Sequence, residues 1–282
     1  MIYGIKVIVK YLLGTDKAER NFKVHPDDTF LVSYPRSGNT WTRFLIANLV
    51  YPNENISFVN IERLIPDSSS ESNRALKRVR RPRIIKTHQY FDHRYPRTIY
   101  IVRDPRDVAL SYYNFHRKNM QLEDSYPLDR YVDDFVSGRL ISADWGTWGE
   151  NVSSWIYTRG NRKDFLLLRY EDMIKDTMLE LTRIATFLGI DAEPLRLQRA
   201  IELSSADRMR GLEKTEQEQW VATRNRRKDI PFVGAAVAGG WKTSLPATCV
   251  RQIEATWGPV MAVLGYPLLY ETLPDKLLSL AY

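Results

Sequence analysis

The chain has 282 residues, of which 44% are apolar, so one large domain with a sizeable core is the default expectation. Lys and Arg number 41 against 34 Asp and Glu, and the net charge of +7 suits an anionic ligand, a nucleic acid or a membrane surface without choosing among them. The single cysteine, Cys249, excludes a disulfide scaffold and a cysteine-rich zinc site.

The first segment, residues 1–13, is partly apolar but is interrupted by Lys6 and Lys10. It is too short to span a bilayer, and no small-residue cleavage site of a secretion signal follows it. We expect it to form a short helix or strand packed on the domain. We therefore expect a cytoplasmic protein without stable membrane insertion.

Four short apolar runs have the composition of buried strands: residues 29–32, 83–86, 98–102 and 165–168. Helical patterns lie between most of them. Strands that alternate with helices predict an α/β fold, with a mostly parallel central sheet flanked by helices on both faces. Only about ten residues separate the second run from the third, which is short for a parallel crossover.

Several of the expected helices have clear ends. Asp104 followed by Pro105 is typical of a helix start, because a capping side chain precedes a proline at the first helical position. A helix expected over residues 176–188 stops at Gly189. Another is expected over residues 194–203.

A polar loop links the first apolar run to the first helical pattern, and it reads Arg36, Ser37, Gly38, Asn39, Thr40. The N–H groups at a helix start and the positive end of the helix dipole favour an anion there. The arginine adds a fixed charge, and the short polar side chains add hydrogen-bond donors. The lysine and second glycine of the Gly-x-x-x-x-Gly-Lys-Ser/Thr nucleotide loop are missing, which weakens a kinase or ATPase interpretation.

Polar side chains also follow the other apolar runs. Lys86 and His88 come at the end of the second, Arg103 follows the third with Ser111 about two helical turns on, and Tyr170 follows the fourth. Ligands of open parallel sheets bind at the carboxyl ends of the strands. We therefore expect these groups to converge on a cleft for a ligand with more than one phosphate-like group.

Taken together, three motifs resemble the sulfotransferases that use 3′-phosphoadenosine 5′-phosphosulfate (PAPS). They are Tyr34-Pro-Arg-Ser-Gly-Asn-Thr-Trp41, Ile85-Lys-Thr-His88 and Tyr100-Ile-Val-Arg-Asp-Pro-Arg-Asp-Val-Ala-Leu-Ser-Tyr-Tyr113. A further stretch, Leu168-Arg-Tyr-Glu-Asp-Met173, is similar to the family's Tyr-Glu-Asp-Met segment. The resemblance implies one P-loop-like sulfotransferase domain over residues 1–282, with its core at roughly 25–270. It also implies sulfuryl transfer from PAPS by in-line displacement, release of 3′-phosphoadenosine 5′-phosphate (PAP), and no metal.

The resemblance assigns catalytic roles to three residues. It makes His88 the general base, and the ordinary pKa of histidine near neutrality suits that task. Arg36 stands where the family commonly has lysine. Because arginine does not give up its proton, Arg36 is expected to clamp the phosphosulfate, while Lys86 is expected to share the task of binding the bridging oxygen.

The resemblance also implies a set of nucleotide-binding residues. Arg103 and Ser111 are expected to bind the 3′-phosphate, Trp41 to lie against the adenine, and Tyr170 and Ser204 to lie near it. The complete set is Arg36, Ser37, Gly38, Asn39, Thr40, Trp41, Arg103, Ser111, Tyr170, Ser204, Arg227 and Lys228.

The last third of the chain departs most from the family pattern, which has Arg-Lys-Gly shortly before Gly-Asp-Trp-Lys. Gly239-Gly240-Trp241-Lys242 matches the second motif, with glycine in place of aspartate. Counting back without a gap places the uncharged residues 234–236 at the basic pair, whereas Arg227 and Lys228 match it only with an insertion. Either the backbone amides of residues 234–236 or these two side chains bind the 3′-phosphate, and we favour the side chains.

Two other functions stay open at this point: a P-loop phosphotransferase or kinase, and a non-catalytic protein that binds anions or nucleic acid through the basic segment 74–83. As a sulfotransferase the chain is expected to act on a small molecule or a glycan and to bind no nucleic acid. Aromatic residues in segments 90–95, 112–126 and 144–148 favour an apolar or aromatic alcohol, or a stacked sugar. The short dimer motif of many family members is not evident, so a homodimer stays open.

Overall fold

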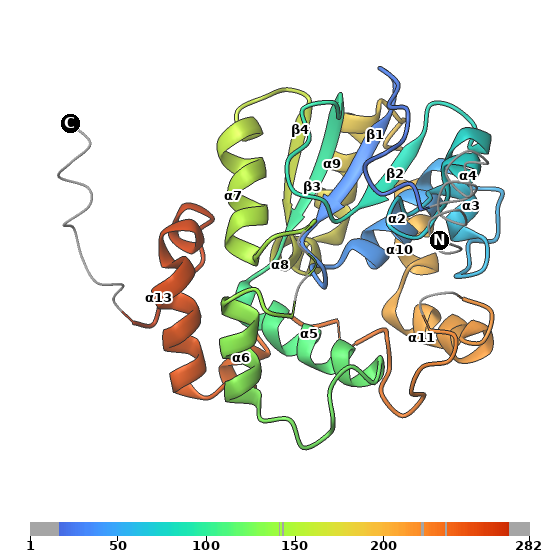
Figure 1. Ribbon diagram of the computed structural model, residues 1–282. Coiled ribbons are helices and arrows are strands. Elements are labelled where there is room, and N and C mark those ends of the chain that lie inside the picture. The colour runs from blue at the N-terminus through green and yellow to red at the C-terminus, as the bar shows by residue number, and fades with distance from the viewer. Residues whose placement is uncertain (1–16, 141, 143, 221–222, 235, 271–282) are drawn as a thin grey trace, which may run out of the picture.

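The computed structural model describes residues 17–140, 142, 144–220, 223–234 and 236–270 (Figure 1). The helix or strand expected over residues 1–13 lies outside these ranges. Among the described residues, no helix is both long enough and apolar enough to cross a membrane.

The fold is built on a four-stranded parallel sheet, as the sequence predicts. The central strand β1 pairs in parallel with β2 on one side and β3 on the other, and β3 pairs with β4. The strands are β1 Thr29–Ser33, β2 Ile84–Thr87, β3 Arg97–Val102 and β4 Phe165–Arg169. Because β2 and β3 lie on opposite sides of β1, residues 88–96 cross only one strand, and they do so without a helix. This explains why so short a connection can join two parallel strands.

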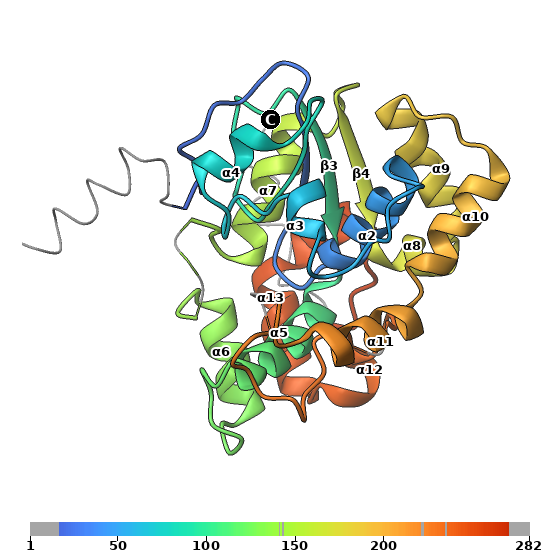
Figure 2. The same cartoon turned by 90° about the vertical axis from the view of Figure 1, so that its right-hand side faces the viewer.

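Side chains alternate between the two faces of the sheet and feed two cores. Phe30 and Val32 of β1 enter one core, and Leu31 enters the other. The first core is covered by α5, α7 and α13, and the second by α2, α9 and α10 (Figures 1 and 2). These helices are α2 Asn39–Val50, α5 Pro105–Lys118, α7 Trp148–Arg159, α9 Thr177–Leu188, α10 Pro194–Leu203 and α13 Ala247–Val263.

Six further helices complete the described part of the fold. They are α3 Ile61–Leu64, α4 Asn73–Arg78, α6 Leu128–Val136, α8 Tyr170–Lys175, α11 Ala206–Glu216 and α12 Trp241–Ser244. Helices α5, α6, α11 and α12 lie on the side toward which the strands run (Figures 1 and 2). The carboxyl ends of the strands therefore open onto these helices.

The predicted helix ends are confirmed. The Asp104 side chain caps α5 by accepting a hydrogen bond from the N–H of Arg106, and Pro105 is the first helical residue. Helix α9 is capped by Asp176 and ends at Gly189, whose φ of 71° is in the left-handed region. Helix α10 spans residues 194–203, as expected.

Candidate active site

The loop between β1 and α2 turns through left-handed backbone conformations at Arg36 (φ 68°) and Gly38 (φ 94°). Gly38 has a second reason to be glycine, because a Cβ there would lie 2.5 Å from Cδ2 of Tyr170. Gly38 is also the N-cap of α2, where no side chain of the described residues makes a capping hydrogen bond. The first N–H groups of α2 and the positive end of its dipole are therefore available to an anion.

The Arg36 guanidinium lies between two aromatic rings, 4.8 Å from the centroid of Phe115 and 4.9 Å from that of Phe232. Its Nε donates to Ser111 Oγ (3.1 Å), and its Nη2 donates to the carbonyl oxygen of Phe232 (3.3 Å). Burial, together with the nearby charge of Arg103, lowers the pKa of Arg36 to about 10. The residue stays protonated at neutral pH, and the acceptors that it reaches are neutral.

Arg103 follows β3 directly and reaches the same region. Its Nη1 donates to the carbonyl oxygen of Arg36 (3.2 Å), and its Nη2 donates to that of Val237 (3.1 Å). Its guanidinium lies 4.3 Å from the centroid of the Tyr170 ring and 3.8 Å from the Asp107 carboxylate. The structure thus brings together the two arginines that the sequence predicted to lie at opposite ends of the nucleotide.

Two buried polar atoms here, Ser37 Oγ and Arg103 Nε, have no hydrogen-bond partner among the described residues. Buried polar groups are nearly always hydrogen-bonded, so each of these atoms indicates a place for a ligand or a water molecule. Phosphate and sulfate groups carry several acceptor oxygens and bind arginine well. The residues present therefore fit a ligand that carries phosphate or sulfate groups.

His88 lies just beyond the end of β2, and its Nδ1 is 2.8 Å from the carbonyl oxygen of Ser33. A carbonyl oxygen only accepts, so Nδ1 carries the proton and Nε2 holds a lone pair. Burial and the charge of Lys86 lower the pKa of His88 to about 3. The Trp145 ring and the imidazole make a T-shaped contact with 5.6 Å between centroids. A neutral histidine with a fixed tautomer therefore stands at the start of the anion-binding loop.

The Lys86 ammonium forms a close ion pair with the Asp67 carboxylate. Asp67 lies in a segment that reads as a plain polar loop in the sequence, but it bridges to β2 and is part of the site. Burial on its own would raise the pKa of Asp67, but Lys86 outweighs it, and the pKa falls to about 2. In this arrangement Lys86 faces a carboxylate and places its charge near His88.

Four of the other predicted residues lie around α2 and its neighbours. Asn39 is buried and donates from Nδ2 to Ser33 Oγ (3.1 Å), so its side chain secures the loop. Thr40 is partly buried in the first turn, and the Trp41 and Tyr170 rings make a T-shaped contact with 6.0 Å between centroids. These contacts place Trp41 and Tyr170 side by side.

The hydroxyl of Ser204, the C-cap of α10, is buried in the second core. There it accepts a hydrogen bond from Asn48 Nδ2 at 3.1 Å. This contact links α10 to α2. It uses the Ser204 hydroxyl, which the resemblance predicts to lie near the adenine.

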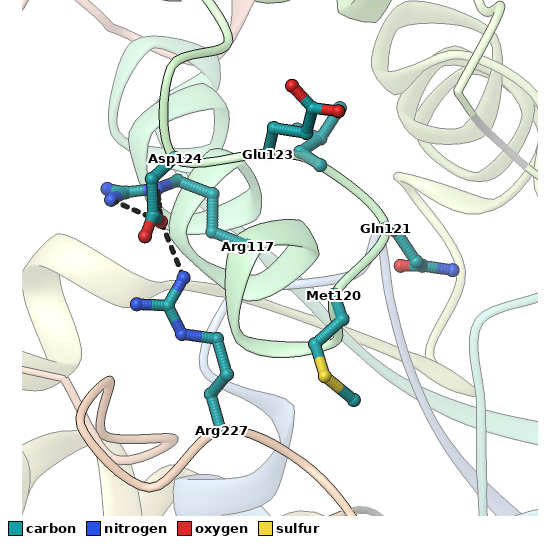
Figure 3. A pocket seen from close by; sticks show the side chains of 7 residues that line it. Arg117, Met120, Gln121, Glu123, Asp124 and Arg227 are labelled. Atoms are coloured by element: carbon teal, nitrogen blue, oxygen red, sulfur yellow. Dashed lines mark hydrogen bonds and ion pairs between the residues drawn. The ribbon is translucent and has the colours of Figure 1, made fainter.

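The structure does not bring Arg227 and Lys228 to the two buried arginines. The Arg227 guanidinium contacts the carboxylates of Asp124 and Asp229, and Lys228 pairs with a surface glutamate. Figure 3 shows Arg227 reaching Asp124, which Arg117 also contacts at 2.8 Å, in a pocket lined mainly by the loop after α5. The favoured 3′-phosphate role of the two basic side chains therefore has no support from their placement.

Two buried acids that sequence reasoning missed hold the segment that covers the arginines. Asp107 of α5 accepts hydrogen bonds from the backbone N–H of Gly239 (2.7 Å) and of Trp241 (2.9 Å). Glu213 of α11 accepts from the N–H of Phe232 (2.6 Å) and of Val233 (2.9 Å). In the sequence, the only sign of these roles is the position of each acid on a helix. The contacts themselves could not be predicted, because they join residues far apart in the chain.

Comparison with known proteins shows the family of this chain. The family model described as "Sulfotransferase domain" matches residues 26–265. The chain is 28% identical over 259 residues to a 3-beta-hydroxysteroid sulfotransferase of Cavia porcellus, with 87% of each chain covered. It is 26% identical over 254 residues to sulfotransferase 1C2 of Oryctolagus cuniculus, with 83% of each chain covered.

Solved structures show the same likeness. The crystal structure of mouse sulfotransferase SULT7A1 complexed with PAP matches with a TM-score of 0.69 and 26% identity, covering 85% of each chain. A retinol dehydratase in complex with androsterone and the inactive cofactor PAP matches with a TM-score of 0.74. Its identity of 21%, over 90% of this chain and 85% of that one, supports the fold alone.

Proposed function

This chain belongs to the sulfotransferase domain family, and we propose that it transfers a sulfuryl group from PAPS to the hydroxyl or amine of a small acceptor. The observation that carries the proposal is one cluster at the carboxyl ends of β1, β2 and β3. There the guanidinium groups of Arg36 and Arg103 adjoin a neutral His88. The Ser37 hydroxyl at the same place has no hydrogen-bond partner within the described ranges.

The nucleotide would lie across the two arginines. Arg36, Ser37 and the N-terminus of α2 would bind the 5′-phosphosulfate, and Arg103 with Ser111 would bind the 3′-phosphate. Bound PAPS supplies the sulfuryl group and the leaving phosphate. The Ser111 hydroxyl accepts a hydrogen bond from Arg36 Nε at 3.1 Å and so orients the Arg36 guanidinium. An incoming anion would compete for both groups.

His88 would act as the general base through Nε2, because its Nδ1 proton is held by the Ser33 carbonyl oxygen. Burial, together with the positive charges of Lys86 and Arg36, lowers the pKa of His88 to about 3. A bound polyanion offsets that charge and raises the pKa of the imidazole toward the range in which it accepts a proton from the acceptor.

Arg36 would stabilise the leaving phosphate by charge and hydrogen bonding. With a pKa of about 10 it keeps its proton at neutral pH and acts as a clamp. Lys86 would help to bind the oxygen that bridges sulfur and the leaving phosphate only if its side chain turned away from Asp67. In its ion pair with Asp67 it adds positive charge beside His88. Catalysis would then rest on positioning and charge stabilisation, as in phosphoryl transfer.

The acceptor would approach His88 from the side of Trp145. Asn151 fixes that side by donating from Nδ2 to the carbonyl oxygens of His88 (3.1 Å) and Trp145 (2.8 Å). The aromatic ring beside the base favours an acceptor with an apolar or aromatic body next to its hydroxyl. The sequence segments 90–95, 112–126 and 144–148 remain the expected determinants of its shape.

Calorimetry tests the proposal. Titration of the purified chain with PAP should give a one-site isotherm at micromolar concentrations, with or without magnesium. Labelled PAPS with a panel of phenols, alcohols, amines and glycans should then identify the acceptor. Absence of PAP binding, or consumption of ATP in a magnesium-dependent reaction, would contradict the proposal and favour a phosphotransferase.

A further inference from the structure

The family pattern places a basic pair where this chain has residues 234–236, which carry no charge. Arg227 and Lys228, the nearest basic residues upstream, are paired with surface carboxylates. A 3′-phosphate contacted by Arg103 and Ser111 alone would therefore lack the cations that the pattern supplies from this segment. A positive charge from another element would take the place of that pair.

Helix α11 presents an arginine to the same segment. Arg210 Nη2 donates to the carbonyl oxygen of Gly234 at 3.2 Å. One helical turn later, Glu213 accepts from the N–H groups of Phe232 and Val233 and fixes the segment against α11. Arg210 therefore stands beside the backbone that takes the place of the basic pair.

Three arginines hold carbonyl oxygens of this one segment. Arg36 donates to Phe232, Arg210 to Gly234 and Arg103 to Val237. Gly234 and Val237 are three residues apart, which limits their Cα atoms to about 11 Å. The Arg103 and Arg210 guanidinium groups therefore both face the backbone of one short segment.

The existing contacts of Arg210 leave it available to such a ligand. Its one carboxylate partner among the described residues is Asp207, at 2.7 Å, and the Asp207 side chain is 96% exposed. Exposed ion pairs of this kind contribute little, and a neutral carbonyl oxygen is a weaker acceptor than a phosphate. An incoming phosphate would therefore compete well for this guanidinium.

Resting on the function proposed above, we infer that Arg210 binds the 3′-phosphate of the nucleotide together with Arg103. The cation comes from α11, in place of the basic pair that the loop lacks. The carbonyl oxygens of Gly234 and Val237 hold the two guanidinium groups in position until the phosphate binds.

The test compares PAP with adenosine 5′-monophosphate (AMP), which lacks only the 3′-phosphate. Arg210→Ala should weaken PAP binding about 10- to 100-fold, because it removes a charged hydrogen-bond donor. AMP binding, measured by competition where it is weak, should change less than about twofold. Arg210→Lys should recover part of the preference for PAP, since it restores a point charge.

Arg208→Ala is the matched control, because it removes the same charge from the same helix. Arg208 is exposed, and its guanidinium reaches Asn55 instead, at 3.5 Å. This variant should leave both affinities unchanged. Thermal unfolding of each variant verifies that the fold is intact, and Arg210→Gln is the substitute if the alanine variant unfolds.

The outcomes separate this inference from the proposed function. Equal weakening of PAP and AMP in Arg210→Ala would show that Arg210 only positions the segment, and would overturn the inference. Unchanged PAP affinity in that variant would overturn it too, while leaving the sulfotransferase function standing. A wild-type chain that does not prefer PAP over AMP would overturn both.

Discussion

Arginines gather in two regions of the chain, an inner site at the carboxyl ends of the strands and an outer cluster at the surface. The two regions differ in the groups that the arginines contact. In the inner site, Arg36 and Arg103 donate mainly to neutral carbonyl and hydroxyl oxygens. In the outer cluster, Arg117 and Arg227 share the Asp124 carboxylate (Figure 3). Neutral acceptors give way to an anion, whereas the Arg227 guanidinium already contacts two carboxylates. We therefore expect an anionic ligand to bind in the inner site and not in the outer cluster.

The pKa values follow the same division. Burial and mutual repulsion lower the pKa of Arg36 to about 10 in the inner site. Hydrogen bonds to Asp229 and Asp124 raise the pKa of Arg227 in the outer cluster. The arginines of the inner site have little negative charge nearby, whereas those of the outer cluster already have it. An anionic ligand would therefore stabilise the charged arginines of the inner site only.

The largest effect is expected at the histidine of the inner site. His88→Ala should lower kcat by roughly 10²- to 10⁴-fold, because it removes the proposed general base. PAP affinity should stay within about threefold, since the nucleotide contacts lie on other residues. Both are measured with labelled PAPS and by calorimetry.

His93→Ala is the control for that experiment. His93 is an exposed histidine in the loop that follows His88, and its replacement should leave kcat close to the wild-type value. Loss of turnover in His93→Ala with normal turnover in His88→Ala would move the base to His93.

A matched pair of arginine variants tests the comparison itself. Arg103→Ala and Arg227→Ala each remove one positive charge. The first should weaken PAP binding about 10- to 100-fold, because it removes charged hydrogen bonds in a buried site. The second should change the affinity less than about twofold, since Arg227 is already paired at the surface. If calorimetry showed the same loss of PAP affinity in both variants, the distinction between the two regions would be wrong.

The smallest effect is a dependence of stability on pH. The pKa of His88 is lowered to about 3 and that of His116 to about 4, in both cases first by burial. Both lie below the ordinary value near 6.5, so the unfolded chain takes up these protons first as the pH falls, which favours unfolding. The free energy of unfolding should drop by roughly 1–2 kcal/mol per histidine between pH 6.5 and 5.

Urea denaturation at several pH values measures this loss. His116→Gln should make the curve shallower in that range while leaving PAP binding in place, because it removes one of the two buried imidazoles. An unchanged pH dependence in this variant would show that His116 titrates normally in the folded chain.

Local patterns were enough to predict the sheet and the grouping of three residues at its carboxyl edge. Each strand is a run of apolar residues, and Asp104 with Pro105 marks the start of α5 by side-chain chemistry alone. Because parallel strands bring their carboxyl ends to one edge, Arg36, His88 and Arg103 were expected together before the strand order was known.

The parts that could not be predicted depend on contacts between distant residues. Nothing near Asp67 indicates that it will face Lys86, and nothing near Glu213 indicates that it will hold the backbone of Phe232 and Val233. The basic side chain of Arg227 was assigned to the nucleotide because its charge is visible in the sequence. Its carboxylate partners become visible only in three dimensions.

The central place of β1 has a consequence for how the chain is made. Thr29 and its neighbours are translated early, but their partners on either side, at Ile84 and Arg97, emerge from the ribosome much later. Until then the apolar run Phe30–Leu31–Val32 has no strand to pair with, and exposed strand edges promote aggregation. A nascent chain that stalls before residue 97 would therefore depend on chaperones to shield this run.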